Sequence, residues 1–124
     1  MTRTLFLTAA GLAALVLPGT GGAQPFSTSM AECAALHQNA AQWVEGEAEA
    51  AALMRVHAGW RDAAIAQAEA EGIADAPARM GALIDDRTGD WEARGLRLFL
   101  SREFRDWMDY CRAFAAHRGL GLDR

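Results

Sequence analysis

Apolar side chains recur at helical spacing in four separate stretches of the chain, with polar residues between them. The last stretch shows this most clearly, because its apolar positions are three or four residues apart and share one helix face: Phe104, Trp107, Met108, Cys111, Phe114 and Ala115. Ser101 precedes them as a candidate cap, and Gly119 follows as a candidate helix end. The pattern predicts a helix over residues 101–118.

The first predicted helix covers about residues 30–45. Ser29 and Glu32 have the spacing of a capping box, in which each side chain bonds the backbone amide of the other residue. Gly46 then marks an end or a sharp break.

The two middle helices are predicted over residues 47–71 and 76–93. Gly72 stops the longer one, and Pro77 suits the first turn of the next. Because glycine weakens a helix, we expect the helix over 76–93 to be the least stable and to break near Gly89.

Four amphipathic helices with short links predict an all-α fold, a small antiparallel four-helix bundle. In up-down-up-down order, Cys33 near the start of the first helix lies beside Cys111 in the second half of the last. An even number of cysteines in an exported chain favours a disulfide, here closing a loop of 78 positions. We therefore expect a bundle closed by the Cys33–Cys111 bridge.

Residues 1–23 have the pattern of a cleaved secretory signal peptide. Arg3 precedes an uncharged apolar run of 13 residues, and Gly21 and Ala23 suit the positions before a cleavage site. A membrane-spanning helix would need about 20 apolar residues. We expect a single helical domain over residues 24–124, without stable membrane insertion after cleavage, in the periplasm or secreted.

The composition restricts the classes of partner that the protein is expected to bind. The predicted mature chain carries 11 arginines, no lysine and 16 acidic residues, a net charge of −5. It has no basic cluster, so we expect no nucleic-acid partner. The abundance of arginine and alanine is typical of a GC-rich bacterial genome.

Three polar residues lie at the centres of apolar stripes. His37 and His57 are interpreted first as core histidines with hydrogen-bond partners, and second as a pH-sensing site that loosens the bundle when protonated. Arg87 has the same placement in the third stripe, where it either extends to solvent or pairs with an acid such as Glu103.

A metal site is the third interpretation of these positions. Met30, His37, Met54 and His57 combine thioether and imidazole groups, which suit copper. Their spacing is not a known metal motif, and methionine at stripe positions usually fills the core. The chain has no Cys-x-x-Cys-His for covalent haem, and we expect no cofactor.

No common catalytic or phosphate-binding motif is present, so we expect a protein that is not an enzyme. The preferred hypothesis is an exported protein that binds a protein or small-molecule partner, with a stress or pH response. The alternatives are a copper-binding protein with Met and His ligands, and a small helical enzyme.

Overall fold

The computed structural model describes residues 24–122, and the predicted signal peptide lies outside this range. Four helices follow one another without a strand in the described chain: α2 (Phe26–Trp43), α3 (Glu47–Ala70), α4 (Ala76–Phe99) and α5 (Arg102–Arg118). The all-α fold class is confirmed. Within residues 24–122, no helix has both the length and the apolar character needed to cross a membrane.

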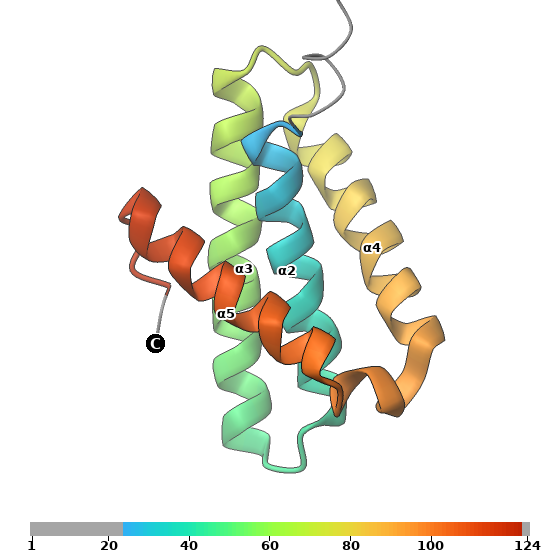
Figure 1. The fold of residues 1–124 in the computed structure, drawn as a ribbon. Coiled ribbons are helices and arrows are strands. Elements are labelled where there is room, and N and C mark those ends of the chain that lie inside the picture. Colours follow the sequence, from blue (N-terminus) through green and yellow to red (C-terminus); the bar gives the residue numbers. More distant parts are fainter. Residues whose placement is uncertain (1–23, 123–124) are drawn as a thin grey trace, which may run out of the picture.

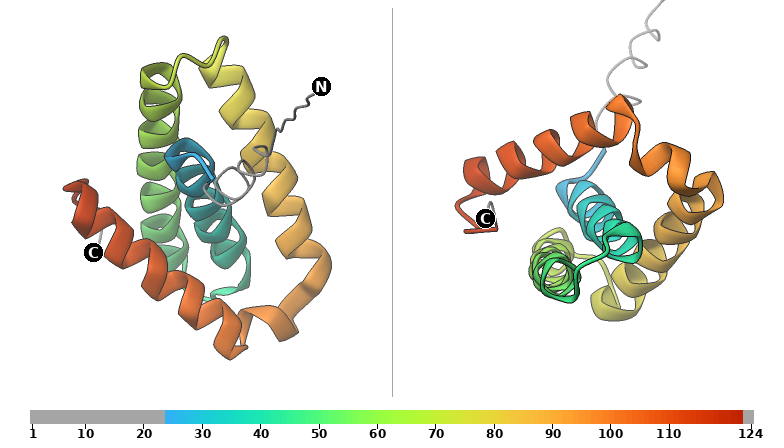
Figure 2. Two further views of the ribbon diagram at one scale, coloured as in Figure 1. Left: turned by 45° about the horizontal axis from the view of Figure 1, so that its top comes forward. Right: turned by 90° about the horizontal axis from the view of Figure 1, so that it is seen from below.

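α2 is the central helix, enclosed by the other three (Figures 1 and 2). It is buried on most of its circumference rather than on one face, and its buried apolar residues are mostly small: Met30, Ala31, Cys33, Ala34, Ala35, Leu36 and Ala40. Small side chains let neighbouring helices approach closely, as the dense packing of protein interiors requires. The sequence pattern therefore underestimated how completely this helix is covered.

α5 crosses the other helices obliquely, in front of α2 and α3 in the view of Figure 1. Cys111 of α5 is joined to Cys33 of α2, with their Cα atoms 5.7 Å apart and both side chains fully buried. The predicted disulfide is confirmed. The bundle thus consists of α2, α3 and α4 packed side by side, with α5 bridged across them.

Both predicted ends of α5 are confirmed. The Ser101 hydroxyl accepts a hydrogen bond from the backbone amide of Phe104 at 3.1 Å. Gly119 has a left-handed backbone (φ 66°), and the next amide, that of Leu120, bonds the carbonyl of Ala115 at 3.0 Å. These local bonds fix the length of α5 independently of its packing.

The start predicted for the first helix is wrong. α2 begins at Phe26 after Pro25, so Ser29 lies inside the helix and makes no capping box. Instead, the Ser29 hydroxyl accepts a bond from the Gln24 side chain at 2.9 Å. The Ser27 hydroxyl donates to the carboxylate of Glu71 at 2.5 Å, which ties the first turn of α2 to the end of α3. Tertiary contacts therefore extend the helix beyond its local signal.

The break predicted near Gly89 is also wrong. α4 runs past Gly89 to Phe99, and its kink is at Gly95, with φ 72° and ψ −167°. This backbone conformation is accessible almost only to glycine. The kink turns the chain toward α5.

Candidate functional site

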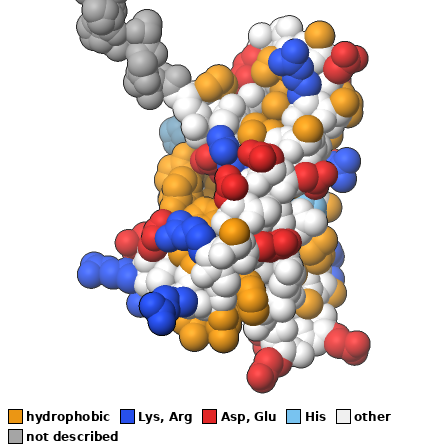
Figure 3. Space-filling model, turned by 90° about the vertical axis from the view of Figure 1, so that its right-hand side faces the viewer, with side chains coloured by type: hydrophobic (Ala, Val, Ile, Leu, Met, Phe, Trp, Pro, Cys, Tyr) orange, Lys and Arg blue, Asp and Glu red, His pale blue; other side chains and the backbone are white. Residues whose placement is uncertain are grey.

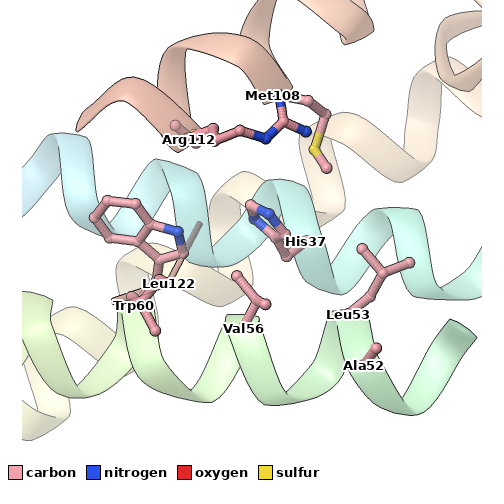
Figure 4. A pocket seen from close by; sticks show the side chains of 9 residues that line it. His37, Ala52, Leu53, Val56, Trp60, Met108, Arg112 and Leu122 are labelled. Atoms are coloured by element: carbon pink, nitrogen blue, oxygen red, sulfur yellow. The ribbon is translucent and has the colours of Figure 1, made fainter. Parts of the chain in front are cut away.

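A cavity of about 180 Å³ lies between α2, α3 and α5. Figure 4 shows His37 of α2 between the side chains that α3 and α5 contribute. The lining residues come from all three helices and the C-terminal segment: His37, Ala52, Leu53, Val56, Trp60, Met108, Cys111, Arg112 and Leu122. Most of the lining side chains are apolar, and His37 and Arg112 are the ionisable groups among them.

Gly59 helps to close this cavity at the C-terminal segment. A Cβ atom at this position would collide with the Leu122 side chain, so only glycine lets Leu122 lie this close to α3. Leu122 itself lines the cavity. The last described residue of the chain therefore covers part of the site.

His37 is buried, and its ring is held by its own helix. Nδ1 lies 2.8 Å from the carbonyl oxygen of Cys33. Because a carbonyl can only accept, Nδ1 carries the proton, and Nε2 of the neutral ring is an acceptor. Burial lowers the pKa of His37 below its ordinary value, the bond to Cys33 opposes this, and the charges of His57 and Arg112 lower it further.

His57 of α3 is likewise buried, and its Nδ1 donates to the carbonyl of Ala34 at 2.8 Å. The two histidines therefore bind consecutive carbonyls of α2. They do not share a cavity, since His57 lines a separate hollow of about 100 Å³ with Arg61 and Asp85. The structure brings the imidazoles to neighbouring positions on α2 but not into one site.

Arg112 lies at the outer part of the cavity. Its side chain is 56% exposed, and Nη1 donates to Asp109 at 2.9 Å. Arg112 and Met108 were not among the site residues predicted from the sequence. The predicted disulfide could have identified them. His37 is one helical turn beyond Cys33, so the residues beside Cys111 must lie near His37 once the bridge is formed.

Arg87 lies away from this cavity, at the contact of α4 with α2. Its Nε is 3.3 Å from a Glu32 carboxylate oxygen, and Asp86 and Asp90 are close to its Nη1, at 3.7 and 3.8 Å. Of the two alternatives for Arg87, pairing with an acid is therefore confirmed, but the acid is Glu32 and not the suggested Glu103, which binds Arg94 at 2.7 Å. Acidic and basic side chains are interspersed on this side of the molecule (Figure 3), as in a solvated structural face.

The four residues considered for copper are dispersed. Met30, His37 and His57 line three different hollows, and Met54 is an exposed side chain of α3. Cys33 is engaged in the disulfide. In the described range, no group of three or more His, Cys, Asp or Glu residues is placed to hold a metal ion.

No family model, no curated protein and no solved structure matches this chain.

Proposed function

We propose that this protein is a non-enzymatic binding protein that holds a small molecule in the cavity beside His37. The observation that carries the proposal is the cavity itself, with apolar walls and two convergent polar groups, His37 and Arg112. Binding sites for small molecules commonly combine an apolar lining with a few placed polar groups. The neutral imidazole supplies an acceptor, and the guanidinium supplies donors.

We propose further that the protein is bacterial, exported by residues 1–23 and released into the periplasm or the medium. The fully buried disulfide supports this location, since such bridges persist in oxidising compartments. The apolar run and small-residue exit of the N-terminal segment support it independently.

The two alternative functions have less support. A metal cation at His37 would lie near the positive charge of Arg112, which is unfavourable. For an enzyme, the described part of the cavity lining offers one general base, His37, and contains no carboxylate or hydroxyl nucleophile.

The test is an NMR titration of the oxidised protein with butyramide, a small neutral molecule. We expect shifts confined to backbone amides around His37, Val56 and the indole of Trp60, saturating at millimolar concentration. Val56→Phe should abolish them by filling the cavity. Ala51→Phe, an exposed change on the same helix, should leave them intact.

Two outcomes would overturn the proposal. One is the absence of saturable shifts in the wild-type protein both with butyramide and, in a second titration, with its anionic counterpart butyrate. The other is shifts that persist unchanged in Val56→Phe, since binding would then lie outside the cavity.

A further inference from the structure

We propose that the ligand of this cavity is a short-chain monocarboxylate, held by Arg112 and bound with uptake of one proton on Nε2 of His37. This inference rests on the proposed function and specifies the chemistry of the same site. It is carried by three features: the size of the cavity, the fork of Arg112 and the fixed tautomer of His37.

The size of the cavity limits the ligand. A cavity of about 180 Å³ has room for several water molecules, since one water needs roughly 10–15 Å³ of such space. It therefore admits a small ligand, such as a carboxylate with a chain of four carbons. Its alkyl part would contact Leu53, Val56 and Trp60, which form the apolar wall on α3.

Arg112 suits a carboxylate better than any other anchor in the cavity. Its guanidinium is planar and always charged, and it can bind both oxygens of a carboxylate. Asp109 uses one of its nitrogens, Nη1, at an exposed position. Among residues 24–122 the other N–H groups of the guanidinium have no hydrogen-bond partner, so they can bind a ligand carboxylate at the opening.

The tautomer of His37 determines that Nε2 is the atom that takes up the proton. Nδ1–H is committed to the Cys33 carbonyl, so the neutral ring presents the Nε2 lone pair, which repels a carboxylate. When Nε2 takes a proton from solvent, it becomes a donor and a positive charge. The ligand carboxylate and the protonated ring therefore stabilise one another, and no bond in the ligand is broken.

Burial is the main cause of the lowered pKa that keeps the His37 ring neutral in the free site, and the charged groups around the ring add to it. Arg112 of α5 and His57 of α3 both disfavour a proton on His37, while Asp109 of α5 partly neutralises Arg112. α4 contributes no residue to the lining. A bound carboxylate would add a negative charge beside the ring and so favour its protonated form.

The experiment is calorimetric titration with butyrate and with butyramide, its neutral analogue, at pH 6.0 and pH 8.0. We expect butyrate to bind at least about threefold more tightly at pH 6.0, within the limit of tenfold per pH unit for one proton. Butyramide should show no pH dependence. Repeating the pH 8.0 titration in two buffers of different ionisation enthalpy should reveal proton uptake.

Variants assign the effect to residues. His37→Gln should remove the pH dependence of butyrate binding. Arg112→Gln should weaken the binding of butyrate at least about tenfold, as expected for loss of a charged hydrogen bond. His57→Gln is the matched control, a second buried histidine outside the cavity, and should keep the pH dependence. Arg112 is exposed, so its variant remains informative if His37→Gln does not fold.

The outcomes separate this inference from the proposed function. Binding of butyramide without butyrate would overturn the carboxylate inference and support the cavity as a site. Butyrate binding that is independent of pH would overturn the inference that His37 takes up a proton on binding. Failure of both molecules to bind would overturn the inference and the proposed function together.

Discussion

At the scale of single residues, the two buried imidazoles form equivalent hydrogen bonds to the backbone of α2, although they come from different helices. His37 binds the carbonyl of Cys33 within α2, and His57 reaches from α3 to the carbonyl of Ala34. Each satisfies a buried polar ring with one backbone bond, as buried polar groups require. They differ in surroundings, because His37 faces Arg112 and the larger cavity.

The lowered pKa of His37 predicts an acid-sensitive fold. Above pH 6.5 the ring is neutral in the folded and the unfolded chain. As pH falls from 6.5 toward the lower folded pKa, the unfolded chain binds a proton that the folded chain does not, so the free energy of unfolding falls. Urea unfolding at pH 7.5 and pH 5.0 should show this, with a smaller difference in His37→Gln.

Glu71 provides the internal comparison for that measurement. Although burial opposes the shift, hydrogen bonds from Ser27 and Gln67 lower the pKa of its carboxylate, so its contribution is lost only as pH falls below about 4.5. The interval from pH 7.5 to pH 5.0 lies above the range in which the Glu71 contribution is lost, so it reports on His37. An equal loss of stability between pH 7.5 and pH 5.0 in the wild type and His37→Gln would contradict the role of His37.

At the scale of elements, α4 shows how one residue type serves two purposes. Gly89 lies in regular, exposed helix, whereas Gly95 supplies the positive φ that turns the chain. A Cβ atom added at either glycine would meet no other side chain within 4 Å, so steric contacts do not distinguish the two positions. Only the backbone conformation does.

Substituting alanine at each glycine should therefore change stability in opposite directions. Gly95→Ala forces a non-glycine residue into a strained region and should lower the free energy of unfolding by about 1–3 kcal/mol. Gly89→Ala should raise it by up to about 1 kcal/mol through helix propensity. Paired urea unfolding curves measure both, and shifts of the same sign would contradict the assignment of the kink.

At the scale of the whole molecule, α5 differs from the other three helices in how it is attached. α2, α3 and α4 pack along their lengths, while α5 crosses obliquely and meets the core through a few buried residues: Phe104, Cys111, Phe114 and Ala115. A bridge at the middle of this crossing restricts a loop of 78 residues.

Removing the bridge should destabilise the fold. The chain-entropy model gives about 4–5 kcal/mol for a loop of this length, as an upper figure. Cys33→Ala combined with Cys111→Ala should thus lower the free energy of unfolding by several kcal/mol, measured by urea unfolding beside the oxidised wild type. A double variant as stable as the wild type would show that α5 is held by packing alone.

The sequence predicted the features whose causes are local or covalent. Periodicity located the four helices, and Ser101 and Gly119 marked the ends of α5 because their capping bonds involve near neighbours. The cysteine pairing followed from the presence of two cysteines in a chain predicted to be exported, and the predicted helix order was compatible with it. The start of α2 was missed because the bond from Ser27 to Glu71 joins residues 44 positions apart.

The cavity could not be predicted, because it depends on the angle at which α5 crosses α2. The apolar stripe of α5 specifies which side faces inward but not this angle. Arg112 is beside that stripe in the sequence and at the cavity only in the folded chain. His37 was identifiable as a polar residue on an apolar face, but its neighbour Arg112 required the structure.

Cys111 belongs to both the bridge and the cavity wall, and this links two equilibria. A molecule held in the cavity stabilises the form of the protein in which α5 is in place, by the difference in its affinity for the two forms. The proposed ligand would therefore protect the disulfide from reductants. By the same reciprocity, reduction of the bridge would lower the affinity of the cavity for that ligand, so the thiol state of the protein and the occupancy of its cavity would be coupled.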